Sequence, residues 1–206
     1  HTRFAAVWLQ SNSRIADLTT GTLVNEVLSA DLIDQMILRS NQSETEVYSD
    51  LNTRLFTNPR YRRPWPRATH GTAVADIAFG AEGTESAAEV PLLGVQIPPE
   101  AAQDTSGTIS EAFIVEGVRW LCAQARQQFP ERALVINISM GVLAGQKDGG
   151  RFIEEQIRRE IVNAEAAGQV VHAVFAYGNG YNARQVAKIT CGPGAELLEW
   201  VIQPDN

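Results

Sequence analysis

The sequence predicts a three-layer α/β fold, in which helices cover both faces of a mostly parallel sheet. Three short, largely apolar runs indicate strands, and amphipathic segments separate them: Val90–Ile97, Ala133–Ser139 and Val170–Ala176. Strands that are apolar along their whole length are typical of parallel sheets buried on both faces. The 206 residues, 44% of them hydrophobic, suffice to build one domain of this kind.

The first third of the chain is less regular. Thr2–Leu9 is short, apolar and aromatic, which favours a strand. Ser29 can cap a helix over Ala30–Leu38, with an apolar face of Leu32, Ile33, Met36 and Ile37. Residues 40–67 are polar and punctuated by proline, so we expect a long irregular segment there.

Three helices are predicted from the periodicity of apolar residues and from residues typical of helix ends. His70–Gly80 has apolar residues at helical spacing, with Val74, Ile77 and Ala78 on its apolar face. Thr108 to Glu111 has the pattern of a capping box, and the helix that it opens runs to about Gln128 before Pro130. A further helix spans about Arg151–Ala167, with Gly168 as its stop. Glu196–Gln203 is expected to form another strand.

Composition excludes several classes of function. The net charge of −7 and the absence of a basic stripe argue against a nucleic-acid partner. No apolar run approaches the roughly 20 residues of a membrane span, so no membrane partner is expected. With two cysteines and three histidines, none in a metal-ligand spacing, we expect no zinc site, and Cys122 is interpreted as a core residue.

Three short segments carry residues suited to catalysis. His70-Gly71-Thr72 places an imidazole at the start of a helix, where a rigid element can hold a general base. Asn137 to Gly141 leaves the carboxyl end of a buried strand, the edge at which open α/β sheets bind ligands. Gly178-Asn179-Gly180 follows the next strand and can aim an amide at a developing oxyanion. Taken singly, each segment is more often structural, because Gly-Asn-Gly, for example, is a common turn.

Taken together, these segments resemble the subtilisin-like serine protease family. The order is similar: a His-Gly-Thr helix, a strand, the segment Thr105-Ser106-Gly107 before a helix, a strand ending in Ser-Met-Gly, a helix, and a strand ending in Ala-Tyr-Gly-Asn. The resemblance covers about residues 68–182. It implies acyl transfer by a Ser-His-Asp triad acting on a polypeptide substrate, without a cofactor.

The resemblance also implies roles for individual residues. His70 corresponds to the general base and Asn179 to the oxyanion donor. The substrate-binding residues would be Ser106 and Gly107 on one edge and Ser139, Met140 and Gly141 on the other. The family often binds calcium, but no acidic loop of the required type is present, so we expect no metal.

The chain departs from the family pattern at two triad positions. No serine follows Asn179, where the nucleophile is expected. Four aspartates precede His70, but none ends an apolar strand in the expected turn: Asp17, Asp31, Asp34 and Asp50. We therefore expect an incomplete catalytic domain, inactive by itself, with the triad aspartate just before His1. Residues 1–67 would be a variable segment between that aspartate and His70, and residues 183–206 the start of an insertion or continuation.

Two alternatives remain open at the level of sequence. One is a non-catalytic relative that uses the same cleft to bind peptides. The other is a dinucleotide-binding domain, because Gly178–Ala183 matches G-x-G-x-x-A after a strand and Asp205 follows about 20 residues later. Against the second, the next helix would be interrupted early by Cys191-Gly192-Pro193-Gly194.

Overall fold

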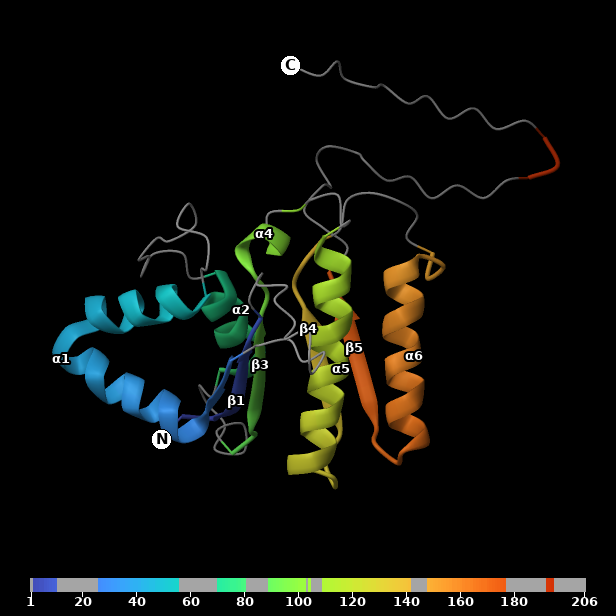
Figure 1. The fold of residues 1–206 in the computed structure, drawn as a ribbon. Helices are drawn as coiled ribbons and strands as arrows, with labels where there is room; N and C mark the ends of the chain where they lie inside the picture. Colours follow the sequence, from blue (N-terminus) through green and yellow to red (C-terminus); the bar gives the residue numbers. More distant parts are fainter. Residues whose placement is uncertain are drawn as a thin grey trace, which may run out of the picture.

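The computed structural model describes residues 2–10, 26–55, 70–80, 89–102, 104, 109–141, 148–176 and 192–194 (Figure 1). The strands are β1 (Phe4–Leu9), β2 (Glu26–Ser29), β3 (Leu92–Gln96), β4 (Leu134–Ile138) and β5 (Val171–Phe175). The helices are α1 (Ala30–Leu55), α2 (His70–Phe79), α4 (Pro99–Ala102), α5 (Ser110–Gln128) and α6 (Phe152–Ala166). The predicted α/β class is confirmed. None of these helices is both long enough and apolar enough to cross a membrane.

The described strands form two sheets. In the first sheet β1 lies in the centre, antiparallel to β2 and parallel to β3. In the second sheet β4 and β5 are parallel. The parallel pairs agree with the prediction, but β3 and β4 are not hydrogen-bonded to each other, so the described strands do not make one continuous sheet.

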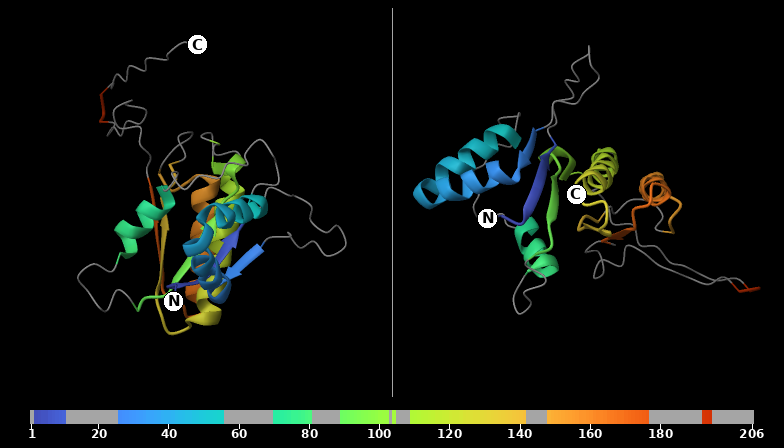
Figure 2. Two further views of the ribbon diagram at one scale, coloured as in Figure 1. Left: turned by 90° about the vertical axis from the view of Figure 1, so that its left-hand side faces the viewer. Right: turned by 90° about the horizontal axis from the view of Figure 1, so that it is seen from below.

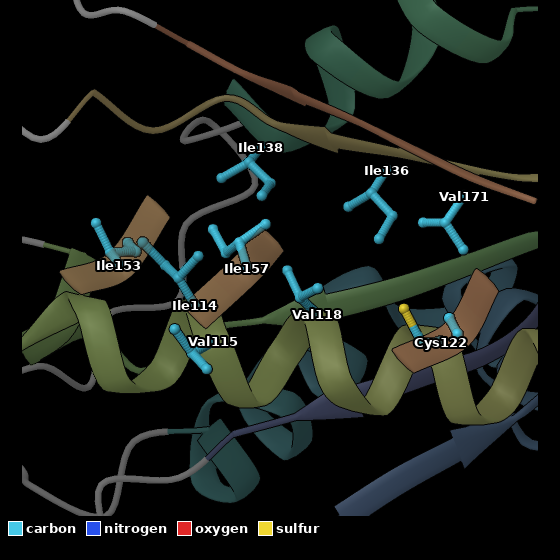
Figure 3. Close-up of a cluster of buried hydrophobic side chains, with 10 residues drawn as sticks. Ile114, Val115, Val118, Cys122, Ile136, Ile138, Ile153, Ile157 and Val171 are labelled. Atoms are coloured by element: carbon cyan, nitrogen blue, oxygen red, sulfur yellow. The ribbon is translucent and has the colours of Figure 1, made fainter. Parts of the chain in front are cut away.

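The larger core lies between the second sheet and helices α5 and α6. We call it the α5–α6 core, and Figure 3 shows most of its side chains between these elements. Its buried members are Ile114, Val115, Val118, Cys122, Ile136, Ile138, Ile153, Ile157, Ala164 and Val171. An ion pair between Arg119 and Glu160 at 2.7 Å, and another between Arg151 and Glu111, join the same two helices.

The opposite face of the second sheet is open in the described part of the chain. Val135 and Val174 are each 59% exposed, and His172 on β5 is exposed as well. β4 and β5 therefore alternate between buried and exposed residues, whereas the sequence predicted burial throughout. His172 lies within Val170–Ala176, which the sequence predicted to be a buried strand, but its side chain is exposed.

Helix α1 corrects the prediction of an irregular segment from residue 40. The helix continues to Leu55 and bends at Ser43, whose backbone angles are φ −152° and ψ 92°. The Ser43 hydroxyl accepts a hydrogen bond from the backbone N–H of Glu46 at 3.4 Å, as a helix cap does. The Ser-x-x-Glu pattern at residues 43–46 was the overlooked signal of a second helical start.

The bend lets both halves of α1 pack on the first sheet (Figures 1 and 2). Ser29 caps the first half as predicted, accepting from the N–H of Leu32 at 3.3 Å. The buried members of this smaller core are Leu9, Leu28, Met36 and Val47. Ile37, predicted on the apolar face, is instead 48% exposed.

The ends of α5 and α6 lie close to their predicted positions, but the side chains that interact with the helix starts are not the predicted ones. The Asp104 carboxylate accepts from the N–H groups of Ile109 and Ser110 at the start of α5. Glu111, expected to complete a capping box with Thr108, pairs with Arg151 at the start of α6. Thr108 itself lies outside the described residues. Beyond α6, Gly168 has φ +87°, the left-handed conformation expected of a helix stop.

Helix α5 also packs against the first sheet, and so it joins the two sheets. Trp120 stacks on Trp8 of β1 with ring centroids 5.6 Å apart. Gly117 faces β3 so closely that a Cβ there would lie 3.3 Å from Cγ1 of Val95. This close approach fixes α5 over the region between β3 and β4.

The Cys122 thiol is expected to be unreactive in the folded chain. Burial, aided by the charge of Glu160, raises the pKa of Cys122 to about 11 from its ordinary value of 9.0. At pH 8 the folded protein then holds about 100-fold less thiolate than the unfolded chain. In a Cys191→Ser variant, iodoacetamide should modify Cys122 at least that much more slowly in buffer than in urea, as mass spectrometry would measure.

The same pKa sets a pH dependence of stability. The folded state disfavours the thiolate form of Cys122. The contribution of the neutral Cys122 thiol to the free energy of unfolding is therefore complete below pH 9 and is lost as pH rises from about 9 to about 11. A Cys122→Ala variant should lose less stability across that window. Equal losses in both proteins would contradict the assignment.

Candidate active site

Helix α2 is held against β1 and β3 mainly at its carboxyl end. The guanidinium group of Arg3 donates hydrogen bonds to the carbonyl oxygens of Phe79 and Val90. These bonds join the start of β1 to the end of α2 and to the segment that enters β3. His70 is the first residue of α2 and is exposed, so its ring is free to meet a ligand.

His70 borders a cavity of about 550 Å³ between β3 and β4. Asn137, Ser139 and Met140, at the end of β4, line the same cavity. The structure therefore brings the predicted base together with two of the predicted substrate-binding residues. Gly141 follows them and is exposed.

The face of α2 that meets the cavity agrees with the predicted one at Val74 but not at Ile77 and Ala78. The residues of α2 that line the cavity are His70, Gly71, Val74, Ala75 and Phe79. Ile77, predicted on the apolar face, is 87% exposed. Spacings of one, four and five residues from His70 define the observed face, so the histidine itself marks the side that faces the site.

The segment after β4 is held by local contacts. The Asn137 amide donates a hydrogen bond to the Ser139 hydroxyl at 2.9 Å, and Met140 packs against the α5–α6 core. The N–H of Ala176 donates to the carbonyl of Ile138 at 2.9 Å, so the chain leaving β5 starts beside the chain leaving β4. Asn137 also borders the cavity, although no individual role was predicted for it; its place at the head of the segment Asn137 to Gly141 could have suggested one.

The remaining predicted site residues lie outside the described residues: Ser106, Gly107 and Asn179. The same holds for the dinucleotide-like segment Gly178–Ala183 and for Asp17. The role of the Asn179 amide as oxyanion donor thus stays a prediction.

Three of the four candidate aspartates can be placed, and all lie on α1. Asp34 accepts a hydrogen bond from the backbone N–H of Thr2, and Asp50 pairs with Arg39 at 3.5 Å. Asp31 is exposed in the first turn of the helix. None of the three lines the cavity that His70 borders.

No group of three or more histidine, cysteine, aspartate or glutamate side chains is placed to hold a metal ion within the described ranges. The imidazole of His70, the amide of Asn137 and the hydroxyl of Ser139 border a cavity whose lining is mostly apolar but also includes Gln96 and Arg132. In such a set the imidazole is the group suited to transfer a proton.

The structure is that of an α/β protein with a cavity that extends to the end of a parallel strand, beside a histidine that heads a helix. The chain belongs to the subtilase family, a family of serine proteases, since the family's model matches residues 27–196. The match is wider than the predicted 68–182 and includes α1. Comparisons with curated proteins and with solved structures give no match.

Proposed function

We propose that this chain is part of the catalytic domain of a subtilisin-like serine endopeptidase, in which His70 is the general base and Asn179 the oxyanion donor. The nucleophilic serine and the triad aspartate would come from polypeptide outside residues 1–206. The observation that carries the proposal is the cavity that His70 shares with Ser139 and Met140, in a chain of the subtilase family.

The position of His70 suits proton transfer. A general base must reach the hydroxyl that it deprotonates, and an exposed ring at the head of a helix can do so without unfolding the helix. Once protonated on taking the serine proton, the imidazole can pass that proton to the leaving amine.

The segment Ser139 to Gly141 would bind the substrate in extended form, opposite Ser106 and Gly107. Residues just past the end of β4 offer backbone donors and acceptors that a peptide can pair with. Met140 adds an apolar, adaptable side chain beside the cavity. The substrate is therefore proposed to be a polypeptide with an apolar side chain near the cleaved bond.

The triad aspartate is proposed to lie just before residue 1. Among the residues that the structure describes, no aspartate lines the cavity, and Asp31, Asp34 and Asp50 all lie on α1, which supports this proposal. Residues 1–67 would then separate the aspartate from His70.

Replacement of Asn179 tests the oxyanion role in the longer natural protein that contains this chain. Asn179→Ala is expected to lower kcat about 10²–10³-fold with little change in KM, the range known for this amide in subtilisin itself. The reason is that the amide binds the negatively charged oxygen of the transition state more strongly than it binds the carbonyl oxygen of the substrate. Peptide hydrolysis under initial-rate conditions measures both constants.

Asn182→Ala is the matched control, since it removes the same side chain three residues away. It should leave kcat within about twofold of the natural protein. Residues 1–206 alone should hydrolyse no peptide. Hydrolysis by the short chain, or equal effects of the two substitutions, would overturn the assignment.

A further inference from the structure

We propose that Arg3 is a positioning residue for the reaction, because its guanidinium group fixes the end of α2 and thereby the place of His70 beside the cavity. The inference rests on the proposed role of His70 as the general base. Arg3 would act through the helix and would touch neither the substrate nor the imidazole. It lies outside residues 27–196, which the family's model matches.

Packing gives α2 little hold on the rest of the described structure. None of the residues of α2 is buried. The side of the helix that faces inward borders the cavity with Val74, Ala75 and Phe79, so a cavity and not a close-packed layer lies beside these side chains. Since a helix in a protein is normally stabilised by packing of its apolar face, the position of α2 depends more than usual on its polar contacts.

Arg3 makes such a contact at the end of the helix. Its Nη1 donates to the carbonyl oxygen of Phe79, the last residue of α2, at 2.5 Å, and its Nε donates to the carbonyl oxygen of Val90 at 3.3 Å. Carbonyl groups in the last turn of a helix have no partner within the helix, and a cation there also meets the negative end of the helix dipole. Because the planar guanidinium holds its donors at fixed angles, the two bonds together set where α2 ends relative to the chain that enters β3.

The backbone that carries this guanidinium is itself held on both sides. The carbonyl of Arg3 accepts a hydrogen bond from the N–H of Leu92, the first residue of β3, at 2.9 Å. The N–H of the preceding Thr2 donates to the carboxylate of Asp34 on α1 at 2.5 Å. Figure 1 shows β1, which starts directly after Arg3, beside β3 and α2. Arg3 therefore joins α2 to a fixed part of the first sheet.

The length of α2 turns a small change at one end into a larger one at the other. His70 and Phe79 are the two ends of a helix of 10 residues, which is about 15 Å long, so a tilt of about 5° at the Phe79 end moves His70 by about 1 Å. A misplacement of about 1 Å caused by a distant change can cost about 10²-fold in rate. The contact of Arg3 should therefore affect proton transfer, although Arg3 lies at the opposite end of the helix from the imidazole.

Substrate binding should depend much less on this contact. The segment proposed to bind the peptide begins at Ser139, just past β4, and Met140 packs against the α5–α6 core. The hydrogen bonds of Arg3 lead instead to α2 and to the start of β3. Loss of these bonds is thus expected to lower kcat and to leave KM nearly unchanged, as for a change that is felt in the transition state alone.

Substitution of Arg3 in the longer natural protein tests the proposal. Arg3→Met removes the donors but keeps an apolar stem, and it should lower kcat for peptide hydrolysis about 10–100-fold with KM within about twofold. Arg3→Lys keeps the charge but lacks the rigid fork that bonds two carbonyls at once, so its kcat should lie between the two. Initial rates give both constants, and a thermal melt shows that each variant folds.

Arg119→Met is the matched control. Arg119 also bonds to two partners, Glu116 and Glu160, but it joins α5 to α6 and makes no hydrogen bond to α2 among those that the described residues show. The Arg119→Met variant should keep kcat within about twofold of the natural protein.

Hydrogen exchange measures the contact separately from the chemistry. In the longer natural protein, the amides of α2 from Val74 to Phe79 should exchange at least about 10-fold faster in Arg3→Met, because a helix end that loses its partners opens more often. In Arg119→Met these amides should exchange at the natural rate. Mass spectrometry or NMR at residue resolution gives the rates.

Three outcomes would overturn the proposal. Unchanged exchange of α2 in Arg3→Met would mean that Arg3 does not hold the helix, whether or not His70 is the base. Faster exchange with an unchanged kcat, or an equal fall of kcat in Arg119→Met, would mean that Arg3 supports the fold and does not position the imidazole. The proposed function fails by a different result, which is full activity of His70→Ala.

Discussion

Replacing His70 by alanine in the longer natural protein is expected to lower kcat/KM for peptide hydrolysis by about 10⁴-fold or more. Without the imidazole, nothing removes the proton of the attacking hydroxyl, and only binding and oxyanion stabilisation remain. The His70 side chain is exposed in the first turn of α2, so its removal takes little packing away from the fold. The melting temperature should therefore hardly change. Initial rates and a thermal melt measure the two effects.

His172→Ala is the control for this prediction. His172 is also exposed but lies on β5 and does not line the cavity that His70 borders. It should retain activity within about twofold. A loss below tenfold in His70→Ala, or a similar loss in both variants, would remove His70 from the role of general base.

The largest effect on stability is expected from Ile153→Ala. Ile153 is 2% exposed in the first turn of α6, and Figure 3 shows it beside Ile114 of α5 in the α5–α6 core. Removing its outer carbons leaves a cavity that the neighbouring elements cannot close, at a cost of about 2–5 kcal/mol in the free energy of unfolding. Urea denaturation should show a lower midpoint with an unchanged slope.

Phe152→Ala provides the comparison at the adjacent position. Phe152 is larger but 67% exposed, so its removal should change the free energy of unfolding by about 0.5 kcal/mol or less. Should Phe152→Ala prove as costly as Ile153→Ala, the packing of α6 on α5 would differ from that described.

Much of the fold was predictable where local signals and burial agree. The strands β3, β4 and β5 and the helices α2, α5 and α6 lie within a few residues of their expected ranges. α1 was misjudged because its second half is mostly polar, and its apolar residues Val47 and Leu51 reach the smaller core only because the helix bends back at Ser43. The exposed face of β4 and β5 was misjudged because apolar residues do not reveal whether a covering layer is present.

The candidate site was predictable in its residue types. His70 and Ser139 could be named from short motifs, because such chemistry needs a ring on a helix and backbone groups at a strand end. The role of Asn137 and the face of α2 that meets the cavity depend on side-chain directions, which motifs do not give.

By itself the sequence determined the class of fold and the order of its elements, since these follow from periodicity and caps, and residue chemistry made His70 the candidate base. Only the tertiary structure decided that His70 and Ser139 border one cavity, and that the described strands β3 and β4 on its two sides belong to separate sheets. Contacts between residues about 70 positions apart depend on how α5 packs across both sheets, and no local pattern encodes that packing.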